Sequence, residues 1–156
     1  MSTPSWTLDV FVNLSSALTG VSTEQLKPAI DPIGIAKQYF ETLNSNIDRA
    51  ELDRLGVTFQ ATSDPNKAAE VILQDPAMGG VARSIMKLWL LGSWYNPKQP
   101  TNAVNVVSSQ AYKESLVWKI MQSHPMGYSM FPFGYWAKNP PPLEQFIQPA
   151  STASKP

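Results

Sequence analysis

The chain has 156 residues, of which 43% are hydrophobic and only 15% charged, a composition typical of one folded domain and not of a disordered chain. The formal net charge of zero hides an asymmetry: residues 1–78 hold ten Asp/Glu and five Lys/Arg, whereas residues 79–156 hold two and seven. These basic residues are scattered singly, which argues against nucleic-acid binding, and the absence of cysteine excludes disulfides, thiol nucleophiles and Cys-ligated metals.

The helical spacing of apolar residues predicts an all-α protein, an irregular bundle of about five to six helices. Asp caps helices and Pro fits their first turn, so the three Asp-Pro pairs at 31–32, 64–65 and 75–76 predict helix starts. We expect helices over about 7–18, 31–47, 52–59, 64–72, 75–94 and 108–121. The fifth is apolar on nearly all sides from Ile85 to Tyr95, so we expect it to be the central element of the core.

The pattern changes after the single histidine. Residues 124–142 contain five prolines, two glycines and five large aromatic residues, which predicts an extended, irregular C-terminal arm over residues 124–147. We assign residues 1–147, arm included, to one domain and expect residues 148–156 to be disordered.

The free energy gained by burying the rings of this arm nearly equals the entropy cost of ordering its backbone. Its rings, Tyr128, Phe131, Phe133, Tyr135 and Trp136, can bury roughly 750–1,250 Å², a gross gain on the order of 20–30 kcal/mol. Fixing the irregular backbone costs roughly 20–35 kcal/mol. We therefore expect the arm to need a well-shaped groove, on this domain or on a partner, and the area matches the ~800 Å² per side of a standard interface.

No catalytic or cofactor-binding motif is visible in the sequence. There is no GxGxxG loop and no Walker lysine, and the six methionines are typical of core filling. His124 is the one candidate general base, but the nearest acidic residues in sequence, Glu114 and Glu144, belong to no recognisable motif. One histidine does not make a typical zinc site, and we expect His124 to end the sixth helix instead.

Several short segments occur in an order that resembles a known family. They are LDVFVNLSSALTG at 8–20, SIMKLWLLGSWY at 84–95, and AYKESLVW, HPMGY and FGYWA within 106–141. Together they are similar to the small subunit of membrane-bound, FAD-dependent sorbitol dehydrogenase. They resemble, more distantly, the small subunits of bacterial FAD-dependent glucose, fructose and gluconate dehydrogenases, and the similarity spans most of the chain.

The resemblance implies a non-catalytic role that assists the folding and flavin loading of a larger enzyme. It implies a large subunit of the glucose–methanol–choline oxidoreductase type, which holds FAD and oxidises a sugar or polyol. In complexes that have one, a multihaem cytochrome c subunit passes the electrons to quinone. The complex would lie on the periplasmic side of the bacterial inner membrane, and this chain itself would bind no cofactor.

The start of the chain departs from the family pattern. Many members carry a twin-arginine leader, but MSTPSWTLDV has neither an Arg-Arg pair nor the basic and apolar regions of a leader. We expect either a leader that has been removed or export with another chain, with a cytoplasmic protein as the alternative. No stretch reaches the ~20 apolar residues that a membrane-spanning helix needs.

We expect the partner to contact the end of the fifth helix and the arm. The predicted interface residues are Trp94, Tyr95, His124, Pro125, Tyr128, Phe131, Phe133, Tyr135 and Trp136. Two other functions stay open. One is a free-standing binding module whose apolar pocket is lined by Trp89, Trp118 and rings of the arm, and the other is an enzyme that uses His124.

Overall fold

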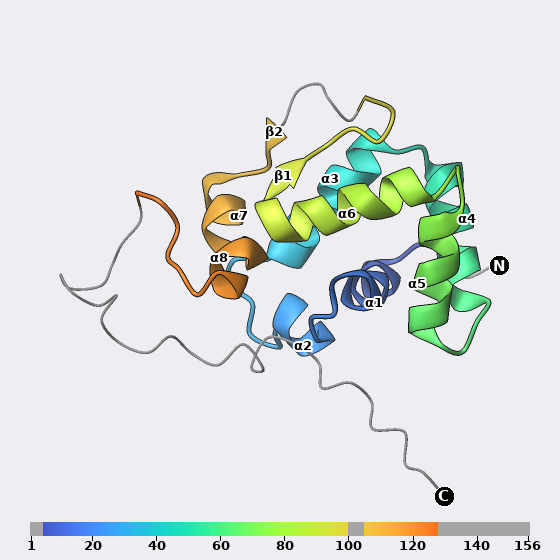
Figure 1. Cartoon of the computed structure of the whole chain (residues 1–156), viewed down its shortest axis with the longest axis horizontal. Helices are drawn as coiled ribbons and strands as arrows, with labels where there is room; N and C mark the ends of the chain where they lie inside the picture. Colours follow the sequence, from blue (N-terminus) through green and yellow to red (C-terminus); the bar gives the residue numbers. More distant parts are fainter. Residues whose placement is uncertain (1–4, 100–104, 128–156) are drawn as a thin grey trace, which may run out of the picture.

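The computed structural model describes residues 5–99 and 105–127, which form an irregular all-α bundle with one short two-stranded ribbon (Figure 1). The predicted fold class is therefore confirmed. The elements are α1 (Leu8–Thr19), α2 (Thr23–Leu26), α3 (Ile35–Asn46), α4 (Arg49–Gln60), α5 (Pro65–Gln74), α6 (Gly79–Leu91), β1 (Ser93–Trp94), β2 (Asn105–Val106), α7 (Ser109–Glu114) and α8 (Leu116–Ile120). The arm from Tyr128 onward and the expected disordered tail lie outside the described residues.

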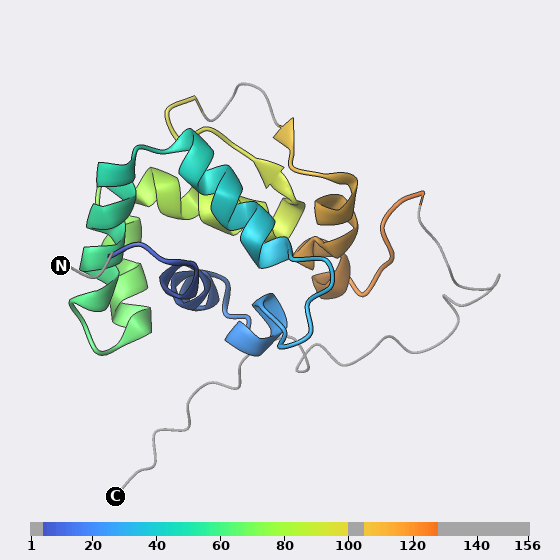
Figure 2. The same ribbon diagram turned by 180° about the vertical axis from the view of Figure 1, so that it is seen from behind.

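Two helices form the centre of the bundle. α1 packs against α2, α3, α4, α5 and α6, and α6 also packs against α3, α5, α8 and β1. Both views of the ribbon show α1 nearly end-on, with the other helices arranged around it (Figures 1 and 2). The expectation that the fifth predicted helix contributes to the core agrees with the burial of Val81, Ala82, Ile85 and Leu88 in α6.

A chain of aromatic contacts joins α1, α3 and α6. Phe11 stacks on Trp89 with ring centroids 6.0 Å apart, and Tyr39 meets Trp89 edge to face at 4.9 Å. Trp6 contacts both Phe11 and Phe40. Such pairs contribute about 0.5–1.5 kcal/mol each beyond their buried area, so these rings fix the relative position of the three helices.

The three Asp-Pro predictions have different outcomes. Asp64 does cap α5, because its carboxylate accepts the N–H groups of Asn66 and Lys67. The predicted starts at Asp31 and Asp75 are wrong. The Asp31 carboxylate accepts the Gly34 N–H at 2.7 Å in a turn that precedes α3. The Asp75 carboxylate closes another turn, so that α6 begins only at Gly79.

The predicted end of the fifth helix near Trp94 is also wrong. α6 ends at Leu91 because Gly92 takes the left-handed conformation, with φ of 65°. A Cβ atom at position 92 would lie 2.5 Å from the carbonyl oxygen of Ala111, so the chain needs glycine here for space as well as for conformation. After this turn the chain forms β1, and Ser93 pairs with Val106 of β2 in an antiparallel register.

The last predicted helix is divided in two. Ser115 adopts an extended ψ of 132° between α7 and α8, and its hydroxyl donates to the carbonyl oxygens of Ala111 and Tyr112. This side chain thus bonds the carbonyl groups that a continuous helix would have paired with backbone N–H groups. The short helix α2 was not predicted, because four residues are too few to show a helical period.

Candidate interaction site

A pocket of about 180 Å³ lies between the segment that connects α2 to α3 and the C-terminal helices. We call it the Trp89 pocket. Its lining residues come from four parts of the chain: Gln25, Leu26, Pro28, Ile30, Asp31, Pro32, Ile33 and Ile35 from the connecting segment and its ends, Trp89 from α6, Glu114 from α7, and Leu116 and Lys119 from α8. Most of them are apolar, which is typical of a binding pocket.

Trp89 is the lining residue with an unsatisfied hydrogen-bonding group. Its side chain is 3% exposed, and its indole Nε1–H has no hydrogen-bond partner among the described residues. Buried donors are nearly always paired, because leaving one unpaired costs about 1–3 kcal/mol. The packing of the Trp89 ring against its neighbours must therefore outweigh the cost of this unpaired donor.

Charged and phenolic groups lie beside the apolar lining. Lys119 Nζ is 3.9 Å from the Glu114 carboxylate, and both side chains are partly exposed, so this ion pair contributes little to stability. Burial, with a smaller effect of the Glu114 carboxylate, raises the pKa of Tyr39 well above its ordinary value. The Tyr39 hydroxyl therefore stays protonated and lies 3.5 Å from the Ala111 carbonyl oxygen as a weak donor.

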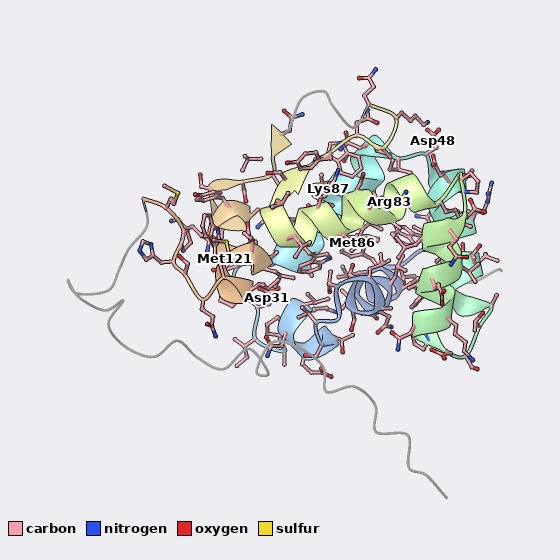
Figure 3. The ribbon with its side chains drawn as sticks, viewed as in Figure 1. Asp31, Asp48, Arg83, Met86, Lys87 and Met121 are labelled. Atoms are coloured by element: carbon pink, nitrogen blue, oxygen red, sulfur yellow. The ribbon has the colours of Figure 1, made fainter. Side chains whose placement is uncertain are left out.

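Exposed apolar side chains occur in the lining of the Trp89 pocket and just after α8. Ile30 is 87% exposed, and Met121 and Met126, which follow α8, are 62% and 74% exposed. Figure 3 shows Met121 close to Asp31, in the part of the molecule where α8 and the α2–α3 connection meet. Methionine is enriched in protein interfaces because its flexible side chain adapts to a partner. We call Ile30, Ile120, Met121 and Met126 the apolar rim.

The structure gives two of the predicted interface residues different environments. Trp94 lies in β1 and is 5% exposed, so its ring belongs to the core of the described chain. Tyr95 is half-buried, and the Lys87 ammonium lies 4.6 Å from its ring centroid. Of Trp94 and Tyr95, only the Tyr95 ring therefore has exposed surface that a partner could contact.

His124 does not end a helix, contrary to the sequence-based expectation. α8 ends at Ile120, and Gln122 takes a left-handed φ of 54°. The Ser123 N–H then donates to Trp118 O at 2.8 Å and the Gln122 N–H to Lys119 O at 3.0 Å, the two bonds of a Schellman C-cap. His124 and Pro125 follow this cap, both half-buried.

One contact of the His124 ring is with the backbone. Its Nδ1 atom lies 2.9 Å from the Pro125 carbonyl oxygen. Of the two carboxylates considered as partners, Glu114 pairs with Lys119 instead, and Glu144 lies outside the described residues. Within 5–99 and 105–127, no three His, Asp or Glu side chains gather as metal ligands do, and no helix is long and apolar enough to cross a membrane.

Sequence reasoning missed the connecting segment as part of a site. The signal was available in Lys27–Ile33, where two prolines flank the apolar Ile30 in a stretch without helical period. Of the tryptophans expected in an apolar pocket, Trp89 lines this one. Trp118 instead donates its indole N–H to Tyr112 O at 2.8 Å and contacts the Tyr112 ring.

The predicted interface residues Tyr128, Phe131, Phe133, Tyr135 and Trp136 lie outside the described residues. Comparison with known proteins adds no identity: no family model matches the chain, and no curated protein matches its sequence.

Proposed function

We propose that this chain is the non-catalytic small subunit of a bacterial FAD-dependent sugar or polyol dehydrogenase of the sorbitol dehydrogenase type. The large subunit, of the glucose–methanol–choline oxidoreductase type, would hold the flavin. The complex would lie on the periplasmic side of the inner membrane, with a multihaem cytochrome c subunit where one is present. The observation that carries the proposal is the ordered series of segments from Leu8 to Pro141.

The surface of the described chain supports a partner-binding role. The apolar rim has four exposed large side chains in or directly after the segments that line the Trp89 pocket, whereas exposed Val57 and Val71 belong to α4 and α5, which do not line it. Scattered apolar side chains are normal on any protein, but a contiguous exposed group marks an interaction surface. We therefore assign Ile120, Met121 and Met126 of the apolar rim, together with Tyr95 and rings of the arm, to the interface with the flavoprotein.

The alternative of a free-standing binding module fits the pocket less well. Pockets for small organic ligands measure about 300–1,000 Å³, and the Trp89 pocket has about 180 Å³. A hollow of about 320 Å³ lies by α1 and α2, but its lining includes the ion pair of Asp9 and Lys27 and is not apolar. The sizes favour recognition of a polypeptide side chain over storage of a metabolite.

Co-expression tests the proposal. A flavoprotein of this class from the same genome is produced with and without the chain, and we expect the flavoprotein alone to be insoluble or poor in flavin. The double variant Met121→Glu, Met126→Glu should co-purify with less flavoprotein, whereas the matched pair Val57→Glu, Val71→Glu should behave as wild type. Full activity and full flavin content without this chain would refute the accessory role.

A further inference from the structure

The Trp89 pocket has the size of one aromatic side chain. A closed apolar cavity of about 150 Å³ is large enough to hold benzene, and this pocket measures about 180 Å³. Most of the side chains that line it are apolar, and they include the ring of Trp89. A ring carried on a polypeptide would fill the space and bury its apolar surface against this lining.

The chain itself supplies such rings close by. Lys119 lines the pocket, and the described chain ends eight residues later, at Gly127. Because a chain extends by at most about 3.6 Å per residue, Gly127 lies no more than about 29 Å from Lys119. The next nine residues, which reach Trp136, can cover about 32 Å and carry five rings. The arm is thus long enough to return to the pocket.

The tether also favours this occupant over a separate molecule. A short flexible connection gives a tethered group an effective concentration in the millimolar range, far above the concentration of a free partner in the cell. Ile30, which is 87% exposed at the mouth of the pocket, and Ile33 would both lose contact with water when the arm lies across them.

We propose that the Trp89 pocket is the docking site of the chain's own C-terminal arm, and that it receives one aromatic ring from residues 128–136. The arm then covers Ile30, which is exposed in the described chain. This assignment does not depend on the identity of the partner, because the pocket and the rings belong to one chain. The rings that do not enter the pocket stay available for the interface with a second protein.

The absence of cysteine allows a clean cross-linking test on the full-length chain. The variant Ile30→Cys, Ser129→Cys places one thiol at the pocket and one at the start of the arm, and Gln25→Cys with Ser129→Cys gives a second reading from another lining residue. The first control is the variant Val71→Cys, Ser129→Cys, in which the first thiol lies on α5, away from the pocket lining, at a position that is 56% exposed. The second keeps both thiols but changes Tyr128, Phe131, Phe133, Tyr135 and Trp136 to serine, so that the tether stays and the five rings are lost.

We expect intramolecular disulfide formation in the pocket pairs to be at least about tenfold faster than in either control, at a rate independent of protein concentration. The Trp89 indole N–H signal in NMR spectra should also shift between the wild type and the serine arm. Equal rates with and without the rings would overturn the proposal. So would disulfide-linked dimers as the main product in dilute solution, because they would identify the arm of a second copy as the occupant.

Discussion

The ring of Tyr39 meets the ring of Trp89 edge to face, with 4.9 Å between the centroids and an interplanar angle of 87°. This contact joins the candidate site to the core, because Trp89 lines the pocket while its ring also stacks on Phe11 of α1. Filling the pocket would therefore restrain Trp89, whose ring contacts both α1 and α3. Binding at this site and stability of the fold should be coupled.

Ser15 and Ser84 form a matched pair for the energetics of buried hydroxyl groups. The Ser15 hydroxyl is fully buried and finds no hydrogen-bond partner in the described part of the chain, whereas the Ser84 hydroxyl donates to Tyr95 O at 2.7 Å. We expect Ser15→Ala to raise the free energy of unfolding by up to about 1 kcal/mol and Ser84→Ala to lower it by about 1 kcal/mol. Urea denaturation of both variants checks the signs, and a loss of stability in both would contradict the unpaired state of Ser15.

Gly92 should tolerate alanine less well than Gly20 does. Both glycines have a positive φ, but a Cβ atom at Gly20 meets nothing within 4 Å, whereas at Gly92 it would lie 2.5 Å from Ala111 O. The left-handed conformation alone costs about 1–2 kcal/mol for a non-glycine residue. Gly20→Ala should show that cost, and Gly92→Ala should cost at least about 1 kcal/mol more. Equal denaturation midpoints would mean that the α6–β1 turn can shift away from Ala111.

Acid should weaken the turn that precedes α6. The N–H groups of Met78 and Ala77, and to a lesser degree Arg54, hold the pKa of Asp75 below its usual range. The unfolded aspartate has its ordinary pKa near about 4, so the stabilisation is present above that pH and is lost as the pH falls through the lower folded pKa. Denaturation midpoints measured from neutral pH downward should fall in this acid range.

The variant Asp75→Asn isolates that effect, because the amide oxygen still accepts hydrogen bonds but does not titrate. Its midpoint should depend less on pH than that of the wild type. Asp48→Asn is the control, since Asp48 begins α4 without a side-chain hydrogen bond to the helix. An unchanged acid dependence in Asp75→Asn would show that other carboxylates dominate.

Trp136 should matter more for assembly than for folding. We expect Trp136→Ala to reduce co-purification of the flavoprotein while the thermal midpoint of the isolated chain changes by only a few degrees. Trp6→Ala should unfold the chain, because the Trp6 side chain is 1% exposed and its loss costs about 3–5 kcal/mol. Equal loss of stability in both variants would place Trp136 in the internal core and argue against a role at the interface.

The sequence predicted the long helices well because their apolar periods and caps are local signals. Thr7 and Gly20 mark the ends of α1, and Asp64 starts α5 as expected. It failed at Asp31 and Asp75, where the same Asp-Pro signal closes a turn instead of a helix. Whether an Asp-Pro pair starts a helix or closes a turn depends on which backbone N–H groups bond to the carboxylate. The packing of neighbouring elements determines those bonds.

The candidate site was harder to predict than the fold. Trp89 was expected beside a pocket, but its partners come from residues 25–35 and 114–119, which are far away in the sequence. Ile30 has no periodic neighbours that would reveal its exposure. Gly92 likewise gives no sequence sign that Ala111 approaches it closely. Contacts between distant segments set all three features, and a single sequence carries no direct record of them.

The stacking of Phe11 on Trp89 cannot form until most of the described chain has been synthesised. The two rings are separated by 78 positions in the chain, and ribosomes add about 5–20 residues per second. Phe11 is therefore added to the chain roughly 4–16 s before Trp89. During that interval α2 to α5 are made and can pack on the first helix, but the side of that helix that meets α6 has no partner yet.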